Sequence, residues 1–271
     1  MDAAAHRAEV EACREWRYAM LRRDLGWLTL AGFAWLRDGT YRVGSDPAAD
    51  IVLPGGPPHA GTLEVDGTTV RSLAGFETRG VLASDRENAP TILESGPLRL
   101  CVIERGGRLA LRTWNLDAPA RTTFAGIPHA PVDPAWRFDA RLHLTPGRTI
   151  DVPDVLGFEE ATASPGTVAF EIGGVSVSLE ALEGGLDGEL WLVFGDTSNG
   201  DDTYGGGRFL YTPPPTDDGG VVVDFNRAYN PPCVFSPYAT CPLPWPANRL
   251  PVRIDAGERY PIDADQEQVA G

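Results

Sequence analysis

The sequence predicts a mainly β protein, built as an antiparallel sandwich or a partly open barrel with one N-terminal α-helix. Short runs rich in β-branched residues recur along most of the chain, and glycine and proline separate them every few residues. Several runs are joined by glycines that suit tight reversals. No helix-length segment separates the runs after the first, which excludes parallel folds such as doubly wound sheets and TIM barrels.

The helix is predicted over residues 3–25. This stretch is rich in Ala, Glu, Arg and Leu, and it carries the apolar residues Val10, Trp16 and Leu21. Gly26 then offers a residue that commonly ends a helix. We therefore expect a single helix before the β region.

The turns VDGT, ERGGR and EIGGVS place glycine where a reversal requires a positive φ, so each predicts a β-hairpin. Antiparallel pairing follows from these hairpins. The predicted strands and hairpins occupy residues 40–44, 50–54, 61–73, 98–114, 140–152, 166–182, 188–196, 208–214, 221–225 and 250–255.

A seam is predicted within residues 115–134, where strand alternation is lost and proline is concentrated. The same stretch is compatible with a long loop inside one domain. The predicted organisation is a helix at 1–25, a small β sandwich at 26–114 and a larger antiparallel barrel or sandwich at 115–271.

Composition restricts the partners. The net charge is −15 and the pI is about 4.6, so the surface repels a phosphate backbone and nucleic acid is not an expected partner. Apolar runs are too short to cross a membrane, and the first residues have no apolar signal core, so we expect a cytoplasmic protein without a membrane partner. The composition is compatible with a homo-oligomer. Every basic side chain apart from histidine is an arginine, a residue that suits planar carboxylate or phosphate groups.

The densest polar segment runs from Val221 to Arg253 and reads VVVDFNRAYNPPCVFSPYATCPLPWPANRLPVR. A strand pattern leads into a loop that combines many hydrogen-bonding side chains with recurrent prolines. Because proline fixes φ in advance, it lowers the entropy lost when such a loop becomes ordered. The segment is therefore predicted to hold polar side chains in place for a ligand.

The stretch GTYRVGSDPAADIVLPGGPPHAGTLEVDGTTVRSL resembles the opening of a forkhead-associated domain, a family of β sandwiches that bind phosphothreonine. Their phosphate grip uses an arginine in the glycine loop and a serine before the histidine. Here Ser45 and Asp46 follow Gly44, and Pro58 precedes His59. The resemblance implies a small sandwich of similar shape without the phosphate grip.

Four segments resemble the domain-of-unknown-function family 1684: GWLTLAGFAWLRDGTYRVGSDPAADIVLP, FAGIPHAPVDPAWR, FGDTSNGDDTYGGGRFLY and the proline-rich tail that ends at Arg259. The resemblance spans roughly Gly26 to Arg259. It implies an architecture, and it points to the glycine-rich and proline-rich segments as the place of a site.

The functional expectation is a small-molecule enzyme without an organic cofactor, a hydrolase, lyase or cyclase that acts on an anionic substrate. Asp224 or Asp196 would transfer a proton, with Tyr204 or Cys233 as further catalytic candidates. The glycines of TYGGGRF would let main chain approach the ligand. The candidates for substrate binding are Arg208, Arg227, Arg249, Asn226, Asn230, Tyr229, Tyr238 and Trp245.

Other interpretations stay open. The same aspartates could cap turns or pair with arginine, which would make the tail a rigid lid of a non-catalytic binding or scaffold module. Cys233 could act as a nucleophile with His129 as its base. Cys233 and Cys241 could form a redox pair, pack as small hydrophobes, or bind a metal with His129 or Asp224, although their spacing lacks a zinc signature.

Overall fold

The computed structural model describes residues 2–87, 89–184 and 188–260. The chain forms two compact units. Unit 1 comprises Met1–Arg17, Ala125–Val234 and Thr240–Gly271, and unit 2 comprises Tyr18–Phe124 and Phe235–Ala239. In the described part of the chain, no helix has both the length and the apolar character that a membrane span requires.

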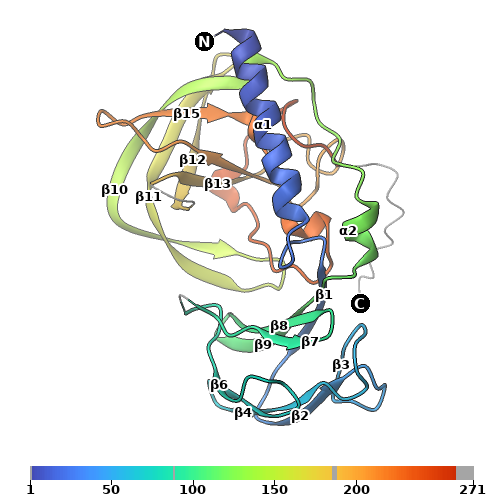
Figure 1. The fold of residues 1–271 in the computed structure, drawn as a ribbon. Helices are drawn as coiled ribbons and strands as arrows, with labels where there is room; N and C mark the ends of the chain where they lie inside the picture. The colour runs from blue at the N-terminus through green and yellow to red at the C-terminus, as the bar shows by residue number, and fades with distance from the viewer. Residues whose placement is uncertain (1, 88, 185–187, 261–271) are drawn as a thin grey trace. The chain divides into compact units, whose positions relative to one another are not determined.

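The elements confirm a mainly β protein with an N-terminal helix (Figure 1). The helices are α1 (Ala3–Leu21) and α2 (Pro119–Thr123), with four 3-10 turns, η1 (Pro134–Trp136), η2 (Phe225–Arg227), η3 (Pro232–Val234) and η4 (Pro246–Asn248). The strands of unit 2 are β1 (Leu30–Trp35), β2 (Gly39–Gly44), β3 (Ile51–Val52), β4 (Gly61–Asp66), β5 (Thr69–Ala74), β6 (Gly80–Leu82), β7 (Leu93–Ser95), β8 (Leu98–Arg105) and β9 (Arg108–Asn115). The strands of unit 1 are β10 (Arg137–Pro153), β11 (Glu159–Ile172), β12 (Val175–Glu183), β13 (Leu190–Phe194), β14 (Arg208–Thr212) and β15 (Gly220–Asp224).

Unit 1 is built on one six-stranded antiparallel sheet in the order β14-β13-β12-β11-β10-β15. Long strands β10 and β11 curve, so the sheet forms a half barrel (Figure 1). The register of these two strands shifts between Leu144 and Arg148, a β-bulge that increases the local twist. Apolar side chains on one face of the sheet form the core of this unit.

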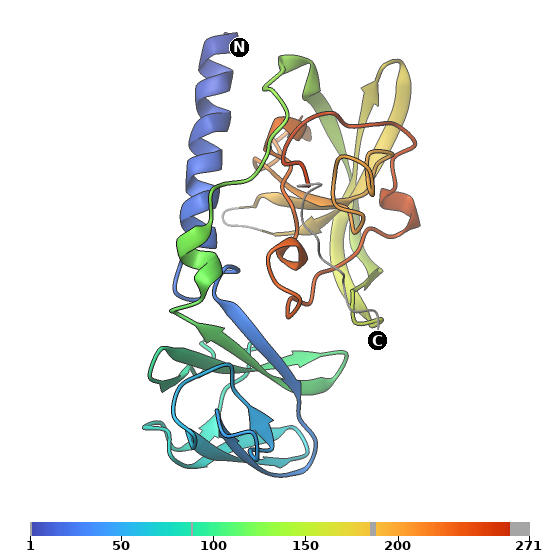
Figure 2. The same cartoon turned by 90° about the vertical axis from the view of Figure 1, so that its right-hand side faces the viewer.

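The C-terminal tail of unit 1 completes that core. Phe225, Leu250 and Ile254 are almost fully buried among the residues of the sheet. The tail itself is loop with short 3-10 turns, drawn in orange and red in Figure 2. The strand predicted at residues 250–255 was wrong, because the main chain there bonds to side chains: Ile254 N–H donates to Asp196 and Ile254 C=O accepts from Arg208.

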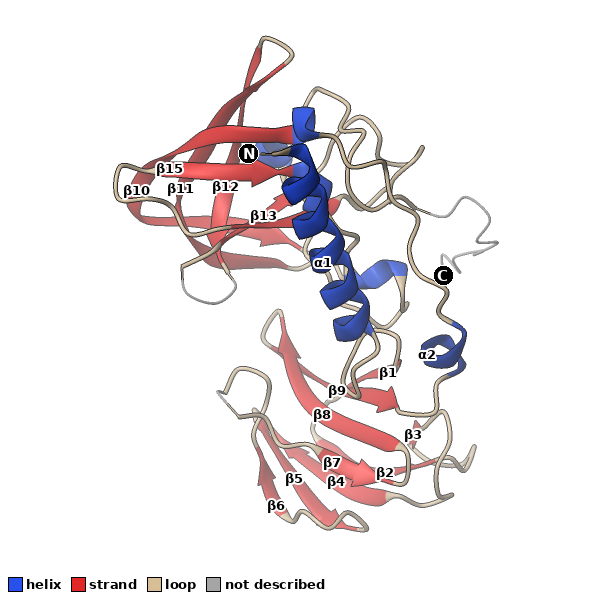
Figure 3. Ribbon diagram, turned by 45° about the horizontal axis from the view of Figure 1, so that its top comes forward, coloured by secondary structure: helices blue, strands red, loops and turns tan. Residues whose placement is uncertain are grey.

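Unit 2 is a sandwich of two sheets (Figure 3). The first has the order β1-β9-β8-β7 and the second the order β3-β2-β4-β5-β6. All pairs are antiparallel except β2 with β3. Leu63, Leu98, Leu100 and Leu111 are almost fully buried between the sheets.

Local sequence explains the turns. The hairpins predicted from VDGT, ERGGR and EIGGVS are confirmed as β4–β5, β8–β9 and β11–β12. In the last of these, Gly173 and Gly174 have φ of +56° and +80°, a backbone conformation that L side chains rarely adopt. Helix α1 ends at Leu21, four residues earlier than predicted. Gly26 is needed nearby, because a Cβ there would lie 2.4 Å from the carbonyl oxygen of Leu21.

Candidate functional site

Asp196 and Arg208 form a buried ion pair in unit 1. Arg208 begins β14, Asp196 follows β13, and neither side chain is exposed to solvent. Arg208 Nη2 donates to Asp196 Oδ2 over 2.7 Å and to the Ile254 carbonyl over 3.0 Å, while Nη1 donates to the Ala256 carbonyl. Burial lowers the pKa of Arg208 and Asp196 opposes that shift. The guanidinium is therefore bound within the protein, where it fastens the tail to the sheet.

Asp224 ends β15 and is also occupied by neighbours. Its Oδ2 lies 2.7 Å from Nε2 of His6 on helix α1, and its Oδ1 accepts from the main chain and the amide of Asn226 over 3.1 and 2.8 Å. The Asn226 side chain also exchanges two hydrogen bonds with the main chain of Asp133. Arg227 lies 3.5 Å from Asp224 and 3.0 Å from Glu9. This cluster joins α1 to the end of the sheet.

A second buried cluster surrounds Glu258. This carboxylate accepts from Arg17 Nε over 3.1 Å and from the main-chain N–H of Asn230 over 2.7 Å. Arg17 also donates to the Asn230 carbonyl over 2.7 Å, and its guanidinium lies 4.6 Å from the ring centroid of Tyr229. Burial raises the pKa of both Glu258 and Tyr229. The arrangement gives Arg17 of α1 a structural partner in the tail.

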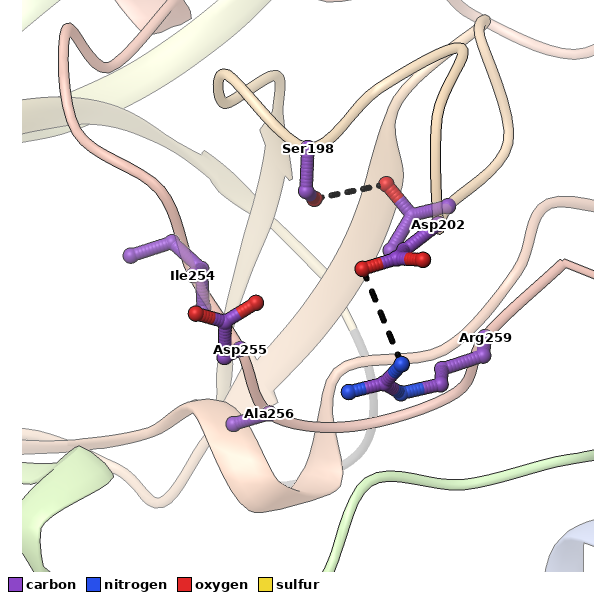
Figure 4. A pocket seen from close by; sticks show the side chains of 7 residues that line it. Ser198, Asp202, Ile254, Asp255, Ala256 and Arg259 are labelled. Carbon is purple, nitrogen blue, oxygen red and sulfur yellow. Dashed lines mark hydrogen bonds and ion pairs between the residues drawn. The ribbon is translucent and has the colours of Figure 1, made fainter.

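A shallow hollow lies where the glycine-rich segment meets the tail (Figure 4). Its lining consists of Ser198, Asp202, Thr203, Ile254, Asp255, Ala256 and Arg259. The hydroxyl groups of Ser198 and Thr203 bond to each other over 2.8 Å, and Asp202 lies 3.6 Å from Arg259. Tyr204 follows the lining residue Thr203 in the sequence, and its ring packs against the ring of Tyr260. These groups fill the hollow and leave no volume for a water-sized guest.

Trp245 and Arg249 belong to the same tail. Trp245 is 7% exposed and its indole N–H donates to Glu180 over 2.7 Å. Asn248, between them, bonds to the main chain of Glu180 and of Val193. Arg249 is exposed. Thus Trp245 packs the tail onto strand β12, and Arg249 is a surface cation.

Cys233 and Cys241 lie close together, and each is a thiol rather than half of a disulfide. The main-chain N–H of Cys233 donates to Cys241 Sγ over 3.1 Å. Within the part of the chain that the structure describes, no group of three or more His, Cys, Asp or Glu is placed to hold a metal ion. The observed contact therefore joins the two cysteines to each other. Among the described residues, no third side chain is placed to complete a metal site with them.

Unit 2 contains a groove with a volume of about 340 Å³. It lies between β1 and β3, each the last strand of its sheet. The lining residues are Ala31, Gly32, Phe33, Ala34, Ile51, Val52, Leu53, Pro54, Leu111, Thr113 and Tyr238. Tyr238, which was predicted to line the site of the tail, thus belongs to unit 2 and to this groove.

His129 is expected to make the stability of unit 1 sensitive to acid. Burial and the cations of Arg14 and Arg17 lower its pKa from 6.5 to about 4. The unfolded chain therefore binds a proton between these values while the folded chain does not, so stability falls as pH decreases from 6.5 to 4. Because part of the imidazole remains in contact with solvent, screening reduces the effect, and we expect the loss to be about 1–2 kcal/mol. Urea denaturation of the wild type and of His129→Gln at several pH values measures this loss. If the free energy of unfolding changed with pH equally in both proteins between pH 4 and 6.5, the assignment to His129 would be contradicted.

The structure thus places the predicted site residues in separate contacts rather than in one common site. All of these contacts lie within unit 1: Asp196 pairs with Arg208, Asp224 contacts Asn226 and Arg227, and Tyr229 and Asn230 both contact Arg17. The sequence analysis missed His6, Arg17 and Glu258. The helical spacing of His6, Val10, Arg17 and Leu21 offered a signal, because residues three and four apart share one face of a helix. Glu258 carried no local signal.

Comparison with known proteins agrees with the resemblance at the C-terminal side. A family model described as "Protein of unknown function (DUF1684)" matches residues 122–259, slightly more than half of the chain. No curated protein matches. Among solved structures, the chain is similar to an uncharacterized protein of Haloarcula marismortui determined by solution NMR, with 29% identity, a TM-score of 0.44, and coverage of 53% of this chain and 81% of that one. The family match includes both the glycine-rich segment and the tail, and the chain belongs to the DUF1684 family.

Proposed function

We propose that the chain is a non-catalytic binding module, and that the groove of unit 2 takes an extended, uncharged segment of a partner protein. One observation carries the proposal. The groove has a volume of about 340 Å³, whereas the hollow beside the glycine-rich segment has no room for a guest. This volume is at the lower end of the range of known ligand sites, which suits two or three side chains rather than a large cofactor.

The lining of the groove favours an apolar ligand. None of its eleven residues carries a charge at neutral pH. Two large side chains there remain open to solvent: Val52 is 56% exposed and Tyr238 is 40% exposed. Covering such surface contributes roughly 25 cal/mol per Å² of apolar area removed from water. An anionic ligand would find no compensating cation among these residues.

The position of the groove favours an extended peptide. Strands β1 and β3 each end a sheet, and an edge strand presents main-chain N–H and C=O groups on the side away from its neighbour. An extended segment can bond to such groups while alternate side chains enter the apolar groove, which is how many sheets recognise peptides. Phe33 and Val52, one on each strand, would contact those side chains.

Contacts in unit 1 support a binding module more than the expected enzyme. Arg208 and Arg227, expected to hold an anionic substrate, bind carboxylates of the chain itself. Asp196 and Asp224, expected to transfer a proton, accept hydrogen bonds from buried neighbours. Such contacts support the interpretation of the tail as a rigid structural lid.

Selection from a phage-displayed library of random seven-residue peptides tests the proposal. We expect the full chain to enrich peptides with alternating apolar residues. The variant Val52→Arg should weaken their binding about tenfold or more, because it places a charge against apolar ligand surface. The matched control is Val81→Arg, on strand β6 at the other end of the same sheet, where valine is 63% exposed.

Backbone amide shifts in NMR spectra show where an enriched peptide binds. Shifts that cluster in residues 30–35 and 51–54 would agree with the proposal. Enriched peptides that bind Val52→Arg as tightly as the wild type, or a selection that enriches no peptide at all, would contradict it. Shifts clustered instead around Asp202 and Arg259 would favour a ligand site in unit 1.

A further inference from the structure

Cys233 and Cys241 are held as a pair by the main chain. Cys233 belongs to turn η3, where Val234 N–H bonds to the Pro231 carbonyl. The carbonyl of Cys241 accepts from Val155 N–H over 3.0 Å. Pro232, which precedes Cys233, and Pro242, which follows Cys241, restrict the backbone further. Two anchored segments therefore hold the cysteines side by side, with Cys241 Sγ 3.1 Å from the main-chain nitrogen of Cys233.

The two thiols differ in ways that suit a sequential reaction. Cys241 is 3% exposed, whereas Cys233 is partly exposed. Hydrogen bonds from Cys241 lower the pKa of Cys233, although burial and the charge of Asp154 oppose the shift. In a thiol pair of this kind, the exposed sulfur reacts first as a thiolate and the buried one follows.

The other two cysteines have the opposite character. Burial raises the pKa of Cys13, and it raises that of Cys101 to about 11. Their thiols are therefore less reactive near neutral pH. They serve as internal controls for any chemistry assigned to the pair.

We propose that Cys233 and Cys241 form a reversible dithiol–disulfide site that reacts with peroxides. The Cys233 thiolate attacks one oxygen of hydrogen peroxide, the O–O bond breaks, and the released hydroxide takes a proton and becomes water. Cys233 is then a sulfenic acid. The Cys241 sulfur attacks Cys233 Sγ, the S–O bond breaks, and a second water leaves with the proton of the Cys241 thiol. The two sulfur atoms lose two electrons in total and the peroxide gains them.

The bond would close a short loop around residues 234–240. Residues 235–239, between the two cysteines, belong to unit 2, whereas both cysteines belong to unit 1. In this loop the Ser236 hydroxyl donates to the Leu30 carbonyl over 2.9 Å, and Phe235 contacts the ring of Phe124 edge-on. A disulfide would limit the motion of the segment that makes these contacts.

Peroxide titration of the reduced full chain tests the proposal. Free thiols are then blocked with N-ethylmaleimide, and the products are read as peptides by mass spectrometry. We expect two of the four thiols to resist blocking, with the peptides of Cys233 and Cys241 crosslinked and lighter by two hydrogens. Dithiothreitol should restore all of them.

Three variants make the result specific. The double variant Cys13→Ser with Cys101→Ser should still form the crosslink. Cys241→Ser should stop at a Cys233 sulfenic acid that dimedone traps, and Cys233→Ser should slow the reaction with peroxide about tenfold or more.

Sulfinic acid at Cys233 of the wild type without a crosslinked peptide would overturn the proposal, as would oxidation of Cys13 or Cys101 ahead of the pair. The wild-type peptides decide this even where a variant fails to fold.

Discussion

Replacing Asp196 with alanine is expected to lower the free energy of unfolding by about 3–5 kcal/mol. The substitution leaves the fully buried Arg208 guanidinium without its carboxylate partner. It also removes the acceptor for the main-chain N–H groups of Ser198 and Ile254. Because Arg208 connects the sheet to the tail, we expect the tail between Leu250 and Glu258 to lose protection from hydrogen exchange first.

Urea denaturation followed by tryptophan fluorescence measures the loss. A double variant, Asp196→Leu with Arg208→Met, removes both charges and should recover much of the stability, since no buried charge is then left unpaired. The matched control is Asp139→Ala, because Asp139 is 96% exposed and lies 4.0 Å from Arg137 in a surface pair. A loss for Asp196→Ala no greater than that of the control would show that the buried pair does not hold the tail.

Replacing Glu258 with alanine is expected to cost a similar amount, about 3–5 kcal/mol. Glu258 is 2% exposed and accepts hydrogen bonds from Arg17 and from the main chain of Asn230. Without it, a largely buried guanidinium and a buried N–H group both lose their acceptor. Since Arg17 lies on α1, the helix should also become more mobile.

Hydrogen exchange of residues 3–17 and urea denaturation together test this result. Glu258→Gln keeps one carbonyl acceptor and should lose less stability than Glu258→Ala. Burial raises the pKa of Glu258, so the folded chain holds this proton at a higher pH than the unfolded chain does. The contribution of Glu258 to stability therefore decreases as pH rises from its unfolded pKa to its folded pKa. In Glu258→Gln the free energy of unfolding should change less with pH over this range. Unchanged exchange in α1 after Glu258→Ala would contradict the role of Arg17 as its anchor.

The contrast between these residues shows how far the sequence predicted the site. The glycine-rich segment and the tail were predicted to meet, and they do so through Arg208, Asp196 and Ile254. What those groups do there depended on partners that are distant in sequence. His6 lies 218 residues from Asp224, and Glu258 lies 241 residues from Arg17. Composition and spacing contain no record of such pairings, so side chains that bind internal partners resembled side chains that await a ligand.

The groove of unit 2 is a second feature that the sequence did not predict. Ala31, Phe33 and Val52 carry no chemical signal in the sequence, because small and apolar residues are typical of any strand. Their significance follows from the place of β1 and β3 at the ends of two sheets. Which strand ends a sheet is decided by the pairing of the whole unit.

The sequence by itself determined the mainly β class, the N-terminal helix and the hairpins, because these depend on local backbone preferences such as the positive φ of Gly173 and Gly174. Only the tertiary structure decided that Arg208 is sealed against Asp196, that residues 250–255 are loop rather than strand, and that Tyr238 lies at a groove. The physical reason is that burial and hydrogen-bond partners are properties of the packed chain, and each polar group takes whichever partner folding brings within reach.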